Sequence, residues 1–266
     1  MPPKLRKGLG AGEECNIFQR VMNLDGKVYR DVPGRKTIRV ELLGEKFFIK
    51  QHFGVGWTEI VKNLLSLKKP VLGAMTEVHA IEKINALGLS TTPLVAFGQR
   101  GNNPAKLQSF VMTKDLGDIV SLEDLCAKWV NSPPNLDFKR KLIIAVAKLA
   151  KTIHKNGVNH RDFYLCHFCL DKEDLTKVNL YLIDLHRVLV HTTPSNTANI
   201  KDIAALYFSA MDIGLTPRDY LRFKHYYQDQ TLEFWMRVDK RAKKLYQKFN
   251  TKKFQEKLRI ERTKLK

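Results

Sequence analysis

The feature that most constrains the fold is a change of periodicity at Ser132-Pro-Pro-Asn135. Before this break, apolar residues alternate with polar ones or form short runs, which is typical of strands. A hairpin is predicted over residues 37–50, with its turn at Gly44-Glu45, and a short strand over 109–113. Residues 76–88 have the period of a helix that ends at a glycine. The first part of the chain is therefore predicted to be mainly strands, with one helix.

After the break, the pattern becomes helical. A long helix is predicted over residues 138–155, followed by a strand over 178–183 and by helices from 199 onward. A strand-rich part followed by a helix-rich part indicates an α+β fold in two lobes. The predicted division is an N-terminal lobe of residues 1–115 and a C-terminal lobe of residues 116–266.

Two carboxylates in the second part stand where predicted elements end. Asp162 follows the long helix and a glycine, and Asp184 directly follows the strand over 178–183. Side chains at strand ends reach the rim of a sheet, where ligands bind. One carboxylate can orient a hydroxyl group and accept its proton, while the other can hold Mg²⁺, which prefers oxygen ligands. Lys50, at the end of an earlier strand, can neutralise phosphate oxygens if a carboxylate fixes its position.

Glu77 is the predicted partner of Lys50. On a helical wheel Glu77 lies in the middle of the apolar stripe that includes Val78 and Ile81, so it faces the protein interior. A buried carboxylate costs free energy unless a cation lies nearby. Glu82 lies off this stripe and is the weaker candidate.

The chain carries a formal net charge of +19, which indicates an anionic partner such as nucleic acid, a membrane surface or an anionic substrate. Residues 237–266 hold thirteen Lys and Arg and three Asp and Glu, a net of +10. A solvated helix face is the alternative interpretation of this segment. The apolar residues between its charges, such as Leu245, Phe249 and Phe254, indicate that one face packs on the protein or enters lipid.

No segment has the pattern of a membrane span or of a secretion signal. The longest apolar run, residues 142–147, is far shorter than the roughly 20 residues that cross a bilayer, and no apolar stretch follows the basic N-terminus. The four cysteines form no disulfide framework in a chain of this length, so a reducing cytoplasm is expected. Cys166 and Cys169 have the spacing of half a zinc site, but no second pair follows, which favours small buried thiols.

Four elements occur in an order that resembles the protein-kinase-like fold: Lys50, Glu77, His160-Arg161-Asp162 and Asp184. Over most of the chain the sequence is also similar to the lipopolysaccharide core heptose(I) kinase family, above all at residues 53–57 (FGVGW), 70–73 (PVLG) and 160–168 (HRDFYLCHF). The resemblance implies two lobes, the first rich in strands and the second in helices. It also implies transfer of the γ-phosphate of ATP to the first heptose of the lipopolysaccharide inner core.

Carried over by position, the resemblance implies a role for each of ten residues and implies ATP and Mg²⁺ as cofactors. The catalytic loop supplies Asp162 as the base, together with His160 and Arg161. Nucleotide binding involves Lys50, Glu77, Thr113 and Asp115, the last two in a hinge, residues 113–116, whose backbone meets adenine. Metal binding involves Asp184 and His167, and Asp202 is the residue that braces the catalytic loop.

The sequence departs from the wider kinase pattern at several positions. His167 stands where most kinases have a metal-binding Asn, which leaves its role and a second Mg²⁺ open. Leu185-His186 rather than Phe-Gly follows Asp184, which weakens any inference of an activation switch. Residues 33–36 contain a single glycine and are either a phosphate-covering loop or an ordinary turn. Asp202 has the alternative role of an acid in the first turn of a helix.

The expected partners are a lipopolysaccharide core acceptor, an anionic membrane surface and, on the grounds of charge, an acyl carrier protein. The expected location is peripheral, at the cytoplasmic face of the inner membrane. A kinase of protein Ser or Tyr residues is the first alternative, although no Ala-Pro-Glu segment follows Asp184. A basic nucleic-acid-binding module is the second alternative, but it leaves the order of Lys50, Glu77, Asp162 and Asp184 unexplained, so no nucleic acid is expected.

Overall fold

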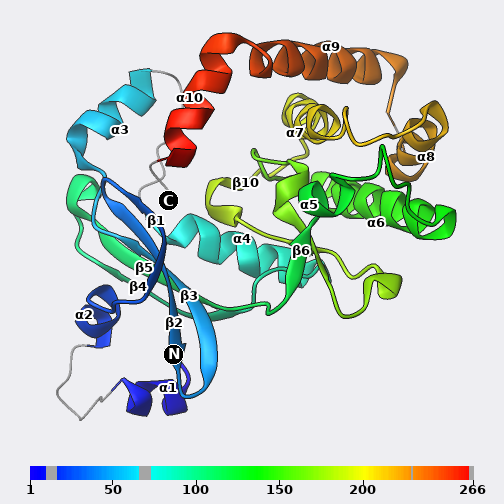
Figure 1. Ribbon diagram of the computed structural model, residues 1–266. Helices are drawn as coiled ribbons and strands as arrows, with labels where there is room; N and C mark the ends of the chain where they lie inside the picture. Colours follow the sequence, from blue (N-terminus) through cyan, green and yellow to red (C-terminus); the bar gives the residue numbers. More distant parts are fainter. Residues whose placement is uncertain (10–16, 66–72, 229, 264–266) are drawn as a thin grey trace. The chain divides into compact units, whose positions relative to one another are not determined.

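The computed structural model describes residues 1–9, 17–65, 73–228 and 230–263 (Figure 1). Cys15, most of the stretch 70–73 and the last three residues of the basic segment lie outside the described residues. The chain divides into two compact units, Met1–Glu82 with Thr92–Leu116 and Lys83–Thr91 with Gly117–Lys266. We call them the sheet unit and the helical unit.

The sheet unit is built on a five-stranded antiparallel sheet in the order β1-β2-β3-β5-β4 (Figure 1). The strands are β1 (Lys27–Val32), β2 (Arg35–Leu42), β3 (Glu45–His52), β4 (Leu94–Arg100) and β5 (Gln108–Lys114). Apolar residues of β2, β3 and β5 form a buried cluster with the short helices α1 (Pro3–Gly8) and α2 (Ile17–Met22). This burial fixes the register of the strands that carry the candidate nucleotide-binding residues.

The β2–β3 hairpin was predicted correctly, but its turn was not. The expected turn residues were 44–45, whereas the positive φ angles lie at Leu43 (55°) and Gly44 (76°). Two successive positive φ angles are the geometry of the two-residue turn that matches the twist of paired strands. The register that results places Lys50 opposite Thr37 and Val111.

Two helices and one 3₁₀ turn complete the elements between these strands: α3 (Gly56–Leu65), α4 (Met75–Ala86) and η1 (Pro104–Lys106). In α4, Val78, Ile81 and Ile84 are fully buried, and Glu77 shares their inward face. Glu82 is exposed. The helical wheel therefore predicted the orientation of α4 correctly.

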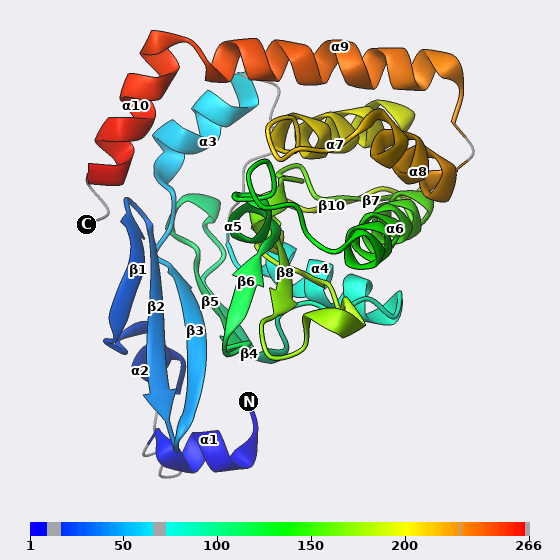
Figure 2. The ribbon, with the colours of Figure 1, turned by 45° about the vertical axis from the view of Figure 1, so that its right-hand side comes forward.

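The helical unit consists mainly of five long helices and a group of short strands. The helices are α5 (Leu122–Cys126), α6 (Leu136–Lys155), α7 (Asn196–Ser209), α8 (Pro217–Tyr227), α9 (Leu232–Phe249) and α10 (Lys252–Thr263), of which all but the first are long. The short elements are β6 (Ile119–Ser121), β7 (Val158–Asn159), β8 (Phe168–Asp171), β9 (Tyr181–Leu182) and β10 (Leu189–Val190), with 3₁₀ turns η2 (Leu165–His167), η3 (Leu175–Lys177) and η4 (Leu185–Arg187). Figure 2 shows α9 running along α7, which agrees with their many contacts.

Helix α6 ends at the predicted residue, Lys155, and begins at Leu136, slightly before the predicted start at residue 138. The Asn135 side chain accepts hydrogen bonds from the amides of Asp137 and Phe138, which are free of helical partners at this end. Gly157, with φ of 71°, turns the chain after the helix, and a Cβ there would lie 2.5 Å from the carbonyl oxygen of His191. The chain therefore leaves α6 directly into β7 and the loop that contains Asp162.

The predicted strand over residues 178–183 was mostly wrong. Only Tyr181–Leu182 form a strand, paired with β8, while Val178 has a left-handed φ of 49° at the end of η3. The alternating apolar residues predicted a strand because Leu180 and Leu182 are indeed buried. The α+β class, with strands first and helices after them, is nevertheless confirmed. Within the described residues, no helix is long and apolar enough to cross a membrane.

Candidate active site

The loop that follows β7 is held by one buried carboxylate. Asp202, on α7 and only 1% exposed, accepts hydrogen bonds from the amides of His160 (2.8 Å) and Arg161 (2.9 Å). Arg161 has a φ of 71°, a conformation that a non-glycine residue keeps only when its surroundings hold it there. Asp202 therefore fixes the backbone of the loop residues directly before Asp162, beyond any effect on its own helix.

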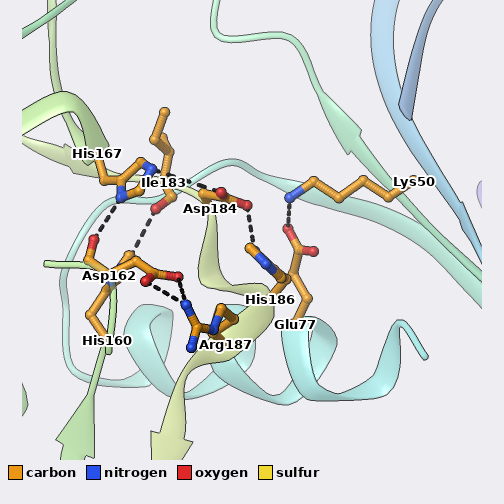
Figure 3. A network of polar contacts seen from close by, with 9 residues as sticks. All are labelled: Lys50, Glu77, His160, Asp162, His167, Ile183, Asp184, His186 and Arg187. Carbon is orange, nitrogen blue, oxygen red and sulfur yellow. Dashed lines mark hydrogen bonds and ion pairs between the residues drawn. The ribbon is translucent and has the colours of Figure 1, made fainter. Parts of the chain in front are cut away.

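Asp162 is paired with a cation that was not anticipated from the sequence. Nη1 of Arg187 lies 2.7 Å and 3.0 Å from the two carboxylate oxygens of Asp162 (Figure 3). The Arg187 side chain is 40% exposed and that of Asp162 is 18% exposed. The guanidinium orients the carboxylate while both remain within reach of solvent. The only signal in the sequence was an arginine three residues after Asp184, which is too common to stand out.

His160 is buried inside the loop. Its Nε2 donates a hydrogen bond to the carbonyl oxygen of Ile183 at 2.9 Å, which joins the loop to the residue before Asp184 (Figure 3). Burial lowers the pKa of His160, so its ring is held in the neutral form. Burial and the nearby charge of Arg187 also lower the pKa of Arg161. His160 is thus placed to position the loop and is remote from solvent.

Asp184 lies between two imidazole rings. Its Oδ1 is 2.8 Å from Nδ1 of His186, and its Oδ2 is 3.8 Å from Nε2 of His167 (Figure 3). Nδ1 of His167 contacts the carbonyl oxygen of Asp162 at 2.6 Å, and a carbonyl can only accept, so this nitrogen carries the hydrogen. In a neutral ring Nε2 is then an acceptor that faces the carboxylate. Two acceptors that face one another fit a cation shared between them.

These donors fit Mg²⁺ as a partial set of ligands. Among the described residues, no group of three or more His, Cys, Asp or Glu side chains is arranged to hold a metal ion. Mg²⁺ is usually held by one or two protein carboxylates, with water and phosphate oxygens completing the octahedron. Asp184 with His167 suits a metal ion that binds together with a nucleotide.

Lys50 and Glu77 form an ion pair within the sheet unit. Lys50 Nζ on β3 lies 2.7 Å from Glu77 Oε1 on α4, as the inward position of Glu77 predicted (Figure 3). Glu77 is only 3% exposed. The strand continues to His52, two residues beyond the predicted end at Lys50. The buried carboxylate is compensated by the cation and holds the ammonium group of Lys50 in place.

Two residues of the predicted adenine hinge, Thr113 and Asp115, are packed or hydrogen-bonded within the sheet unit. Thr113 is buried in β5. The Asp115 carboxylate binds Nε of Arg39 at 2.6 Å, and the Asp115 amide donates to the carbonyl oxygen of Lys46 at 2.9 Å. The side chain and the amide of Asp115 are thus both used within the protein. A contact of this hinge with adenine stays a prediction.

Residues 33–34 form the turn between β1 and β2, and Arg35 and Lys36 are the first two residues of β2. Gly34 has a φ of 79°, and its carbonyl oxygen accepts from the amide of Phe53 at 2.9 Å. A Cβ at Gly34 would lie 2.4 Å from the carbonyl oxygen of Gly54, so only glycine fits. Of the two interpretations, the ordinary turn is present, and a contact with phosphate stays a prediction.

The described cysteines are reduced thiols. Cys126 and Cys169 are buried, and Cys166 is half-buried. Burial raises the pKa of Cys126 and of Cys166 to about 12 and that of Cys169 to about 11, which keeps the thiols protonated. Of the two cysteines with the spacing of half a zinc site, Cys169 is thus buried as predicted and Cys166 is partly buried.

The helical unit also contains an apolar cavity of about 730 Å³ that is partly open to solvent. Its wall comes from α5 to α9 and from the segments beside them, and includes Trp129, Leu206, Phe223 and Trp235. Asp219, Lys224 and Asp239 supply charged groups at its lining. A cavity of this size is within the range of pockets that hold small ligands. Nothing in the sequence pattern predicted it.

Comparisons with known proteins find relatives in both sequence and structure. Residues 19–227 match the model of the lipopolysaccharide kinase (Kdo/WaaP) family. The chain is 44% identical over 243 residues to the lipopolysaccharide core heptose(I) kinase WaaP of Pseudomonas aeruginosa, which covers 87% of this chain and 90% of the relative. It is 44% identical over 217 residues to the protein of the same name from Escherichia coli K12. That match covers 80% of this chain and 81% of the relative. A solved structure, WaaP in complex with acyl carrier protein, superposes with a TM-score of 0.76 at 37% identity, covering 92% of this chain and 97% of that one.

Proposed function

The chain belongs to the lipopolysaccharide kinase (Kdo/WaaP) family, and from that membership we propose that it transfers the γ-phosphate of ATP to the first heptose of the lipopolysaccharide core. It is a kinase with the two-part, kinase-like fold of this family. The observation that carries the proposal is the loop braced by Asp202, which presents Asp162 next to Asp184 and the neighbouring ring of His167.

In this proposal each residue has one task. Asp162 accepts the proton of the heptose hydroxyl as that oxygen bonds to the γ-phosphorus and ADP leaves with the bridging oxygen. Arg187 keeps the carboxylate in a single orientation. Asp184 and His167 would hold Mg²⁺, which would neutralise charge on the phosphate oxygens when bound. Lys50, fixed by Glu77, contacts the phosphates of ATP, and the 113–116 hinge binds adenine.

The relatives favour this acceptor over the two alternatives. A kinase of protein Ser or Tyr residues would use the same catalytic residues, but the relatives from Pseudomonas aeruginosa and Escherichia coli, at 44% identity, are both lipopolysaccharide kinases by name. A nucleic-acid-binding module would not require Asp202 to hold the backbone of the loop before Asp162.

Phosphate transfer from labelled ATP to purified core lipopolysaccharide tests the proposal. Lipopolysaccharide whose first heptose carries no phosphate should be labelled, and lipopolysaccharide truncated before that heptose should not. A generic protein substrate serves as the second control. Labelling of the protein substrate together with failure to label either lipopolysaccharide would reject the proposed acceptor.

We also propose that an acyl carrier protein binds the helical unit and places its acyl chain in the apolar cavity. A structural neighbour is described as WaaP in complex with acyl carrier protein. The net charge of +19 suits an acidic carrier, and the cavity wall suits a hydrocarbon chain.

Acyl-loaded carrier protein should therefore raise the melting temperature of this protein, while the carrier without its acyl chain should raise it less. Ligands that bind only the folded state stabilise it in proportion to the logarithm of their concentration. Ala210→Phe, which places a ring in the cavity lining, should weaken the effect of the acyl chain. Equal stabilisation by both forms of the carrier would refute an acyl-binding role for the cavity.

The third element of the proposal is peripheral attachment to an anionic membrane through α9 and α10. Phe234, Val238 and Ala242 form the buried face of α9, so the predicted packing of one face on the protein is present. The opposite faces expose a set of basic residues, namely Arg237, Lys240, Arg241, Lys243, Lys244, Lys248, Lys252, Lys253, Lys257 and Arg259. Each cation near an anionic surface contributes about 1 kcal/mol to binding.

Binding to vesicles that contain anionic lipid should fall steeply as salt rises from about 0.05 M to about 0.5 M, because the Debye length shrinks from about 14 Å to about 4 Å. Replacing Lys240, Lys244 and Lys252 by Gln should weaken this binding, and the same change at Lys128, Lys155 and Lys172 is the matched control. Sedimentation with vesicles measures both. Salt-independent binding, or equal binding to neutral vesicles, would contradict the electrostatic attachment.

A further inference from the structure

His186 lies against Asp184 but has no task in the proposed reaction. Its Nδ1 is 2.8 Å from Oδ1 of Asp184, and its side chain is 13% exposed (Figure 3). A carboxylate oxygen only accepts, so Nδ1 carries the hydrogen and donates it to Oδ1. The direction of this hydrogen bond thus follows from the carboxylate alone.

The hydrogen bond decides which way the carboxylate of Asp184 faces. Rotation about the bond between Cβ and Cγ is otherwise soft, since this torsion has broad energy wells. With Oδ1 held by His186, Oδ2 lies 3.8 Å from Nε2 of His167, the nitrogen whose lone pair faces it. Ligand atoms on one small divalent ion lie about 2.1 Å from it and hence at most about 4.2 Å apart. The observed separation therefore lets a single ion contact both atoms.

The backbone keeps His186 beside Asp184. Asp184 has a left-handed φ of 59° and directly precedes the 3₁₀ turn η4, which contains His186. Leu185, between the two, is 1% exposed, and its carbonyl oxygen accepts from the amide of Val188 at 3.1 Å. A buried side chain and a closed turn leave the imidazole little freedom to move away. The contact is therefore built into the turn.

From this geometry we propose that His186 is a positioning residue for the metal ion of the reaction. By donating to Oδ1 it turns Oδ2 of Asp184 toward His167, so that a carboxylate oxygen and an imidazole nitrogen are ready to receive Mg²⁺ together with ATP. His186 acts through Asp184, since its Nδ1 carries a hydrogen and cannot bind a metal. The inference rests on the proposed function, because the ion belongs to the proposed transfer of phosphate from ATP.

Two substitutions at His186 separate the hydrogen bond from the space that the ring fills. His186→Leu keeps most of the volume and removes the donor. His186→Asn places an amide NH₂ group near the position of Nδ1, so it can still donate to Oδ1. Mn²⁺ binding in the presence of ATP, followed by electron paramagnetic resonance, should be about 10–100-fold weaker in His186→Leu, the range for loss of a partner of a metal ligand. His186→Asn should bind Mn²⁺ nearly as tightly as the native protein.

Two comparisons show whether a weaker affinity comes from the orientation of Asp184. His225→Leu makes the same change at an exposed histidine of α8 and should leave Mn²⁺ affinity unchanged. In the Asp184→Asn background, His186→Leu should weaken Mn²⁺ binding little further, because the carboxylate that His186 positions is gone. The melting temperature without metal shows whether each variant is folded, and His186→Ala, which also lacks the donor, replaces a His186→Leu protein that does not fold.

In phosphate transfer, the Mg²⁺ concentration that gives the half-maximal rate should rise in His186→Leu, and saturating Mg²⁺ should restore most of kcat. A residue with a merely structural role would lower kcat at every Mg²⁺ concentration.

Native Mn²⁺ affinity in a folded His186→Leu protein would overturn the inference. Equal weakening by Leu and by Asn, or an undiminished effect in the Asp184→Asn background, would overturn it as well. A native protein that binds no Mn²⁺ with ATP would reject both the inference and the metal-binding role of Asp184. If the native protein binds Mn²⁺ with ATP but labels no lipopolysaccharide, the proposed acceptor fails, and the comparison at His186 still decides the inference.

Discussion

Replacing Asp162 by Asn should lower the turnover number for phosphate transfer by about 10²–10⁴-fold, the range expected when a general base is lost. The amide has nearly the same size as the carboxylate but cannot accept the proton of the attacking hydroxyl. Asp202 holds the amides of His160 and Arg161, and that support does not involve the Asp162 side chain. Affinity for ATP should therefore stay close to that of the native protein.

Single-turnover phosphate transfer and ATP binding by calorimetry measure the two quantities separately. Asp118→Asn is a suitable control, because Asp118 is exposed in the same unit and its carboxylate pairs with Lys172 on the surface. Near-normal turnover in a correctly folded Asp162→Asn protein would remove Asp162 from the mechanism.

The second large effect is expected at Asp184. Asp184→Asn should lower turnover by about 10²–10³-fold, the range for loss of one major electrostatic contact in an active site. Asp184 has φ of 59° and ψ of 56°, a left-handed conformation that Asn tolerates well. Asp184→Asn therefore removes the charge and leaves the backbone conformation unchanged. Asp184→Ala would remove the charge and would also place a residue that disfavours the left-handed conformation at this position.

Titration with Mg²⁺, and with Mn²⁺ followed by electron paramagnetic resonance in the presence of ATP, gives a measurement that does not depend on turnover. Both metals should bind more weakly to Asp184→Asn than to the native protein. Asp171→Asn is the control, since Asp171 lies on β8 of the same unit and its carboxylate caps the amide of Glu173. Unchanged metal affinity would show that Asp184 is not a ligand.

Much of the fold followed from local patterns, because the elements concerned bury one continuous face. The β2–β3 hairpin and the inward position of Glu77 on α4 are of this kind, since each depends only on which neighbouring residues are apolar. The prediction of a strand over residues 178–183 was wrong because it also depended only on which neighbouring residues are apolar. Alternating residues were buried there, but the chain around Val178 turns through a left-handed residue, which periodicity does not report.

The features that the sequence did not reveal are tertiary. Arg187 meets Asp162 only because η4 and the catalytic loop are neighbours in space, and nothing marks an arginine as the partner of an aspartate 25 residues away. The hydrogen bond between Tyr227 and His154 joins the ends of two helices. Periodicity predicts which helix faces are apolar, but whether those faces fill the space between them depends on how the helices pack.

The apolar cavity of the helical unit gives this kinase a place where an inhibitor need not imitate a nucleotide. Compounds that compete with ATP bind to groups that are shared by the enzymes that bind ATP. The cavity wall is built instead from side chains such as Trp129 and Trp235 that have no part in holding phosphate. Leu165, three residues after Asp162, also belongs to that wall. An apolar drug lodged there would contact the chain close to the catalytic base and would remain effective at high cellular concentrations of ATP.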